Sequence, residues 1–271
     1  MKRLLVAAVV CTAVYGARGG TTGPAIETLT VTNATWTGAG SDALASNPAN
    51  WSEGVAPGTN AAVIVGPDPG GVSRAMEWDL DVPLHSWNQL DTYTNGVTVD
   101  TVYSESGFDC LTVAHDFTIA GGEMKHKSNV DEAGDVYRLK LDVGGNFALA
   151  TNATTGAYGS INLKGLGYPK NPGYAVNDRG GSHGGSQYDN PGRCYGLIKN
   201  PTQTGSAGLY GSKSSNGGGA FYLTCASNVV VDGGINADGT GNYYGTLTSY
   251  YRSGSGGSIY IKGHTVTGAG A

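Results

Sequence analysis

The stretch LDVGGNFAL at Leu141–Leu149 decides the fold, because two close variants of it occur in the same 271-residue chain. LTVAHDFTI fills Leu111–Ile119, and LTCASNVVV fills Leu223–Val231. All three share the form L-x-[VC]-x-x-[DN]-[FV]-x-[ILV]. The second copy begins 30 residues after the first (141 − 111), and the third begins 82 residues after the second (223 − 141). Repeats at such spacings are typical of a solenoid, in which neighbouring units stack.

The spacing of apolar residues predicts that each copy is a strand, a corner and a second strand. Residues at the first and third places lie on one side of a strand, because side chains alternate across it. The x-x-[DN] step then shifts the apolar pattern by one residue, as a corner requires, and we expect Asp or Asn there to hydrogen-bond its own backbone. Glycine pairs follow two copies, at Gly121–Gly122 and Gly233–Gly234, where a positive φ costs little.

We therefore predict an all-β fold, a right-handed parallel β-helix with a long glycine-rich lateral loop. The alternative is a β-sandwich, in which Leu-x-Val alternation is equally common and short strands recur at similar intervals. The recurrence of one corner residue type favours the β-helix, because a sandwich does not need identical bends.

Three further segments combine a glycine, a small residue and alternating apolar positions, at 159–163, 219–223 and 257–261. In the last two, Tyr222 and Tyr260 point away from the core positions. If the strands stack in register, these tyrosines form an exposed aromatic row. Such a row is ordinary sheet cover or, alternatively, a surface on which sugars stack.

The composition excludes several classes of protein. Glycine makes up 46 residues but follows no strict Gly-X-Y period, which argues against collagen. The 16 tyrosines and 4 tryptophans supply the burial that disordered chains lack. The net charge of −5, with scattered Lys and Arg, argues against a nucleic-acid partner.

The N-terminal sequence MKRLLVAAVVCTAVYGARGG resembles a secretory signal, with a basic start, an apolar run and small residues at its end. We assign residues 1–17 to this signal peptide. Its apolar run is too short to span a bilayer, and no later segment approaches 18 apolar residues. The sequence therefore predicts a secreted or cell-surface protein with no transmembrane segment after signal cleavage.

The rest of the chain divides by pattern. We expect residues 18–75 to form a lead-in and cap, in which Trp36 and Trp51 cover the end of the strand column. Residues 76–271 then form the β-helix, with the glycine-rich excursion at about 165–218 and no apolar period there. The strand pattern is still in progress at Ala271, so we expect the full protein to be longer.

No cofactor or metal is expected. Cys110, Cys194 and Cys225 remain after signal cleavage, and an odd number argues against a disulfide framework, although one pairing stays open. Asp232, Asp238 and Asn242 lie in the glycine-rich turn VDGGINADGTGN, but this turn falls short of the known calcium loops.

Four segments carry a resemblance to a protein family: NWSEGVAPGTNAAVIV from Asn50, YRLKLDVGGNFAL from Tyr137, RGGSHGG at Arg179–Gly185 and SGSGGSIYIKG from Ser253. They resemble the large glycine-rich secreted proteins of Planctomycetes and Verrucomicrobia, which are similar to autotransporter passenger domains and adhesins. The resemblance covers about 80% of the mature chain. It implies a β-helical protein exposed at the cell surface.

The function predicted from these observations is structural or adhesive, without catalytic activity. The alternative is a carbohydrate-active β-helix, either a polysaccharide lyase or hydrolase or a sugar-binding module, with extracellular polysaccharide or cell-surface components as partners. Such enzymes need clustered carboxylates and a basic residue. The candidate ligand-binding residues all lie in the excursion: Asp178, Arg179, His183, Asp189 and Arg193. The alternative interpretation is that they are ordinary solvated loop residues.

Overall fold

The fold is all-β, as the sequence predicts. The computed structural model describes residues 30–67, 70–132, 134–168, 183–184, 195–210, 213–241 and 253–270. Within them the elements are strands and one short 3-10 helix, η1 (Pro48–Asn50). Val31–Ala271 forms one compact unit, distinct from Met1–Thr30.

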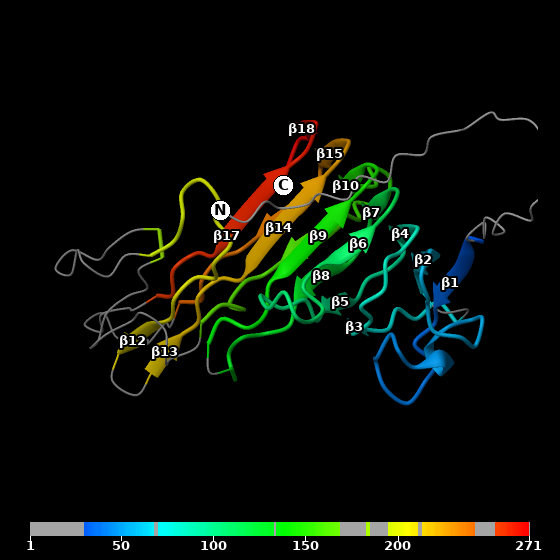
Figure 1. The fold of residues 1–271 in the computed structure, drawn as a ribbon, viewed down its shortest axis with the longest axis horizontal. Helices are drawn as coiled ribbons and strands as arrows, with labels where there is room; N and C mark the ends of the chain where they lie inside the picture. Colours follow the sequence, from blue (N-terminus) through cyan, green and yellow to red (C-terminus); the bar gives the residue numbers. More distant parts are fainter. Residues whose placement is uncertain are drawn as a thin grey trace, which may run out of the picture. The chain divides into compact units, whose positions relative to one another are not determined.

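Three parallel sheets make up most of the fold (Figure 1). The seven-stranded sheet contains, in spatial order, β1 (Thr32–Trp36), β2 (Ala61–Val65), β4 (Ser86–Gln89), β7 (Phe117–Ile119), β10 (Phe147–Leu149), β15 (Asn228–Val231) and β18 (Thr265–Thr267). The five-stranded sheet contains β16 (Gly234–Asn236), β11 (Ser160–Asn162), β8 (Glu123–His126), β5 (Gly96–Val99) and β3 (Met76–Trp78). The four-stranded sheet contains β17 (Ser258–Lys262), β14 (Ala220–Cys225), β9 (Leu139–Val143) and β6 (Leu111–Val113).

The chain visits the three sheets repeatedly in one order. β6, β7 and β8 enter the four-, seven- and five-stranded sheets in turn, and β9, β10 and β11 do the same. β14, β15 and β16 follow the same path, and β17 and β18 begin it again. We call each such passage a rung. Every strand of these rungs therefore pairs with the equivalent strand of a neighbouring rung, and these pairs are parallel.

The three related nonapeptides occupy equivalent places in adjoining rungs. Leu141 pairs with both Leu111 and Leu223, at the first apolar position. At the position after the corner, Phe147 pairs with both Phe117 and Val229. The apolar residues at these positions are fully buried, so each column of equivalent residues lies in the core.

A line of aromatic rings runs through this core. Phe147 stacks on Phe117 with ring centroids 5.6 Å apart, and Phe117 stacks on Trp87 at the same distance. The line continues through edge-to-face contacts among the tryptophans: Trp87 with Trp78, Trp78 with Trp51, and Trp51 with Trp36. Such contacts add to the stabilisation from burying the rings. Trp36 and Trp51, in the segment we expected to be a cap, are thus part of the packed core, and β1 and β2 extend the seven-stranded sheet.

The three large sheets exclude the alternative fold, and the excursion holds an element that the sequence does not indicate. The alternative of a β-sandwich requires antiparallel sheets, whereas the three large sheets are parallel throughout. The excursion at 165–218 also contains regular structure that its lack of apolar period concealed. Within it, β12 (Gly208–Tyr210) pairs with β13 (Lys213–Ser215) in an antiparallel hairpin. Such a hairpin is formed by backbone hydrogen bonds, so a segment without an apolar period can still build it.

The corner residues form a ladder between rungs, and our expectation that each bonds its own backbone is wrong. Asp116 Oδ1 accepts hydrogen bonds from the backbone amide (2.8 Å) and Nδ2 (3.1 Å) of Asn146. Asn146 Oδ1 in turn accepts from the amide (3.3 Å) and Nδ2 (3.2 Å) of Asn228. Asn228 Oδ1 accepts from Thr265 Oγ1 at 2.6 Å. Parallel stacking places equivalent corners about 4.8 Å apart, so the side chain reaches the next rung.

Most of the glycines next to the strands are needed because neighbouring backbones approach closely there, and not because the turn requires a positive φ. Of the two predicted glycine pairs, only Gly122 has a positive φ, 66°. Gly159 lies so close to the neighbouring rung that a Cβ there would be 2.0 Å from the carbonyl oxygen of Ile119. A Cβ on Gly233 would similarly be 1.9 Å from the carbonyl oxygen of Gly159. These positions exclude any side chain because adjoining backbones touch there.

A buried histidine connects two sheets. His126, on β8, is fully buried, and its Nε2 accepts a hydrogen bond from the amide of Ala220 on β14 at 3.2 Å. Its Nδ1 lies 2.6 Å from the carbonyl oxygen of Lys127 and therefore carries the proton. Burial lowers the pKa of His126 to about 4, although the bond to Lys127 opposes this shift.

We expect Asn146→Ala to lower the free energy of unfolding by about 0.5–1.5 kcal/mol, because it removes the middle of a solvent-exposed ladder. The measurement is chemical denaturation followed by circular dichroism. Asn33→Ala is the control, since Asn33 is an exposed asparagine of the same sheet outside the ladder. Equal stability of Asn146→Ala and the wild type would show that the ladder does not hold the rungs.

His126 should make stability depend on pH. Because its folded pKa lies below the ordinary value of 6.5, the unfolded chain binds more protons between about pH 6.5 and 4. The free energy of unfolding should therefore fall through this window by up to about 3 kcal/mol, and this contribution vanishes above it.

The raised pKa values of Asp100 and Asp135, both about 6, act in the opposite direction, so the test compares two proteins. Burial is the main cause of both shifts. His126→Gln should be less stable than the wild type at pH 7, and this difference should shrink as the pH falls to 4. A difference that stays constant with pH would contradict the assignment of a buried neutral imidazole.

Candidate functional site

A groove lies along the five-stranded sheet, from β5 through β8 and β11 to β16, and its larger part also includes inward-facing positions of the last strands, Ile235 and Ile259. It has two adjoining parts, with cavity volumes of about 310 and 650 Å³. Glu123, Tyr158 and Ser160 line both parts. The smaller part is completed by Thr94, Asn95, Gly96 and Gly122, and the larger part by Ile161, Asn162, Gly234, Ile235, Asn236, Ala237, Asp238, Gly256, Gly257 and Ile259.

The polar lining follows from the alternation of side chains along each strand. On β8, Met124 and His126 are buried in the core, which leaves Glu123 and Lys125 on the outer face. On β11, Ile161 is buried, and its neighbours Ser160 and Asn162 face outward. Because β8 and β11 pair with Ser160 opposite Glu123, the outward residues of both strands come together.

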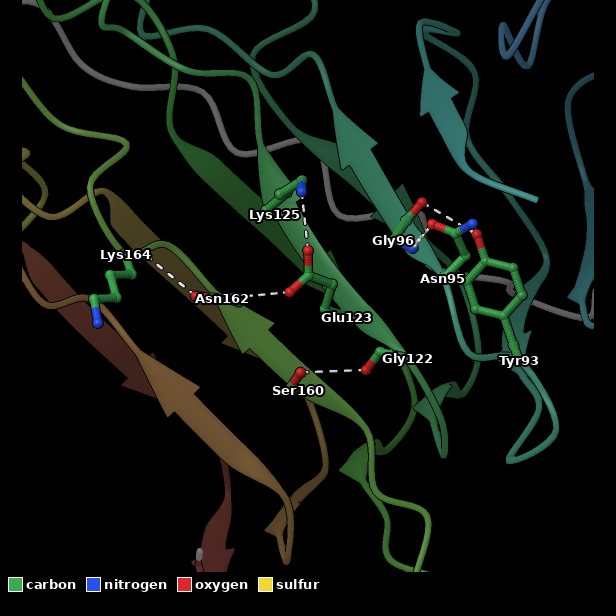
Figure 2. A network of polar contacts seen from close by, with 9 residues as sticks. All are labelled: Tyr93, Asn95, Gly96, Gly122, Glu123, Lys125, Ser160, Asn162 and Lys164. Atoms are coloured by element: carbon green, nitrogen blue, oxygen red, sulfur yellow. Dashed lines mark hydrogen bonds and ion pairs between the residues drawn. The ribbon is translucent and has the colours of Figure 1, made fainter. Parts of the chain in front are cut away.

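Glu123 is the centre of a hydrogen-bond network (Figure 2). Lys125 Nζ lies 2.9 Å from Glu123 Oε1, and Asn162 Nδ2 donates to Oε2 at 2.8 Å. Burial alone would raise the pKa of Glu123, but the hydrogen bonds from Lys125 and Asn162 outweigh it, and the pKa is lowered. Glu123 is therefore a carboxylate with both oxygens engaged, held in one orientation.

The network extends to both sides of Glu123. The Oγ of Ser160 donates to the carbonyl oxygen of Gly122 at 3.2 Å, and the Oδ1 of Asn162 accepts from the amide of Lys164 at 3.3 Å (Figure 2). On β5, the amide of Gly96 donates to Asn95 Oδ1 at 2.9 Å. These bonds fix the polar groups of the lining before any ligand arrives.

Two large side chains give the groove an apolar component. Tyr158 is 52% exposed and borders both parts. Ile259 on β17 is 42% exposed and borders the larger part. An exposed aromatic ring beside fixed amide and carboxylate groups is the combination found where proteins bind ligands that have both apolar faces and hydroxyl groups.

Of the five residues predicted as ligand-binding, the structure describes His183 alone. Its Nδ1 lies 3.0 Å from the carbonyl oxygen of Gly256, its Nε2 lies 3.4 Å from Ser258 Oγ, and its ring packs against Tyr195. Burial lowers the pKa of His183. Gly256 lines the groove, whereas His183 lies behind it and holds its backbone in place. Asp178, Arg179, Asp189 and Arg193 lie outside the described residues, so their role as ligand-binding candidates stays a hypothesis.

The glycine-rich turn and the cysteines were the other candidates for a metal site or a disulfide. Asp232 Oδ1 accepts a hydrogen bond from the amide of Ala269 at 2.9 Å, Asp238 is exposed at the groove, and Asn242 lies outside the described residues. No group of three or more His, Cys, Asp or Glu residues in the described ranges is arranged to hold a metal ion. Cys110 and Cys225 are both free thiols.

Tyr222 and Tyr260 pair across β14 and β17, as the alternation predicts. Their rings stack with centroids 4.6 Å apart and an interplanar angle of 9°. Both are half-buried on the outer face of the four-stranded sheet. Because their faces cover each other, they leave less aromatic surface for a ligand than Tyr158 does.

Comparisons of this chain with protein-family models, with curated proteins and with solved structures found no match. Over the ranges that the structure describes, no helix has the length and apolar character needed to cross a membrane.

Proposed function

We propose that this protein is an exported right-handed parallel β-helix with a structural or adhesive role, and that it binds extracellular polysaccharide in the groove without cleaving it. The fixed order in which the chain visits the three sheets supports the β-helix. Right-handed connections between parallel strands are strongly preferred in proteins. The signal-like N-terminus supports export.

The single observation that carries binding rather than catalysis is the state of Glu123. Glycoside hydrolysis needs a carboxyl group that keeps its proton near neutral pH and a second carboxylate across the bond. Glu123 has a lowered pKa and accepts hydrogen bonds from Lys125 and Asn162, so it carries no proton to donate near neutral pH. The same fixed carboxylate is well suited to accept hydrogen bonds from sugar hydroxyl groups.

The direction of the groove favours an extended polymer as ligand. The groove crosses β5, β8, β11 and β16, whose outward positions recur about every 4.8 Å. A linear polysaccharide lying across the strands would meet Glu123 and Asn162 on successive rungs while the apolar face of one sugar ring covers Tyr158.

The charge of the lining favours neutral over acidic polysaccharides. Among the described residues that line the two parts, Glu123 and Asp238 are acidic and none is basic. Lys125 offsets the charge of Glu123, but Asp238 is exposed at the groove and would repel the carboxylates of a polyuronate. Neutral chains avoid this cost.

Binding can be tested by affinity electrophoresis and calorimetry with soluble neutral glucans, mannans and xylans, and with polygalacturonate and alginate as acidic probes. At least one neutral polysaccharide should bind. Tyr158→Ala should weaken that binding about tenfold, which corresponds to about 1.4 kcal/mol, because the exposed ring is lost. Tyr222→Ala is the matched control, since Tyr222 lies on a different sheet, and its affinity should equal that of the wild type.

Two results would contradict the proposal. Equal loss of affinity in Tyr222→Ala and Tyr158→Ala would place the binding surface elsewhere. Release of shorter or unsaturated sugars from any of these polysaccharides, followed by chromatography and ultraviolet absorbance, would favour the carbohydrate-active enzyme that the sequence left as the alternative.

A further inference from the structure

Two histidines stack at one corner of adjoining rungs. His85 precedes β4, and His115 lies in the corner between β6 and β7. Trp87 pairs with Phe117, so His85 and His115 occupy equivalent places two residues earlier. The amide of His115 donates to the carbonyl oxygen of His85 at 2.9 Å, and the ring centroids are 4.2 Å apart. His115 is exposed and His85 is half-buried, so solvent reaches the pair.

The stacking of rungs does not require histidine at this corner. The equivalent places in the following rungs hold Gly145, Ser227 and His264, as the pairing of Phe147, Val229 and Val266 fixes. A glycine and a serine therefore satisfy the same backbone geometry. The fold therefore does not require imidazole side chains at this corner, and the pair is confined to the two levels that contain β4 and β7.

We propose that His85 and His115 together bind one divalent transition-metal ion. Neutral imidazole is a preferred ligand for Cu²⁺, Ni²⁺ and Zn²⁺, whereas Mg²⁺ and Ca²⁺ prefer oxygen. The strand pairing holds the two rings side by side, and their planes meet at 64°, so neither ring lies flat on the other. With the centroids 4.2 Å apart, one nitrogen of each ring can bind the same ion once the side chains turn toward it.

The site has two protein ligands. Within the described residues, no third His, Cys, Asp or Glu completes a set of three with this pair. Water therefore fills the other coordination positions, and the ion is exchangeable. For such a site, Cu²⁺ binds more tightly than Ni²⁺ or Zn²⁺. This inference is independent of the polysaccharide groove, which lies on another sheet.

The test measures Cu²⁺ and Ni²⁺ binding to the chain, purified without a histidine tag, by calorimetry and by the melting temperature. We expect Cu²⁺ to bind and to raise the melting temperature, because the ion joins two rungs of the folded state. His85→Ala and His115→Ala should each weaken Cu²⁺ binding at least tenfold. His264→Ala is the matched control, because His264 occupies the same corner with Ser227 as its neighbour, and it should bind like the wild type.

The electron paramagnetic resonance spectrum of the Cu²⁺ complex supplies a second readout. Splitting from two nitrogens is expected in the wild type, and from one or none in His115→Ala. If His115→Ala does not fold, His115→Gln provides the same comparison with a polar side chain of similar size. Wild-type affinity and spectrum in both single variants, or loss of binding in His264→Ala, would overturn the proposal.

Discussion

The fold depends on equivalent residues of successive rungs lying directly over one another. The ladder from Asp116 through Asn146 and Asn228 to Thr265 ties the corners together outside the core. A slip of one residue would break each of these bonds and would also turn every buried apolar residue toward solvent. The polar ladder and the apolar columns therefore specify the same register, and this agreement between local and global structure is what allows one sequence to select one fold.

The core shows how the same register accommodates different side chains. Phe117 and Phe147 stack nearly parallel, whereas the tryptophans of the first rungs meet edge to face. In the next rung, the position equivalent to Phe147 holds the smaller Val229. There the ring of Phe221, on β14, contacts Phe147 with a centroid distance of 6.2 Å. The small side chain on the seven-stranded sheet is thus compensated by a large one on the four-stranded sheet, which keeps the core densely packed.

The strands of two sheets could be predicted from the sequence because their pattern is strong. The nonapeptides carry an apolar alternation and a corner residue, and both features describe β6, β7, β9, β10, β14 and β15 correctly. Of the five-stranded sheet, β11 lies in the segment 159–163 whose pattern the sequence shows, whereas β16 consists of Gly234–Asn236 and has Ile235 as its one apolar residue. The groove lies on that sheet, so Glu123 and Asn162 could not be recognised without the register between β8 and β11. The bonding of the ladder was also missed, because a neighbouring rung is not visible in a local pattern.

The insertion between β11 and β14 shows where this architecture tolerates change. β14 pairs directly with β9, residue for residue from Phe221 opposite Leu139, although more than seventy positions separate them in the chain. The sequence between β11 and β14, which includes the hairpin β12–β13, is thus inserted between two adjacent levels without disturbing the pairing of β14 with β9. An inserted segment can therefore enter between two turns of the stack and add buried residues of its own, such as Thr204, Ser206 and Ala207, while the strands on either side keep their pairing.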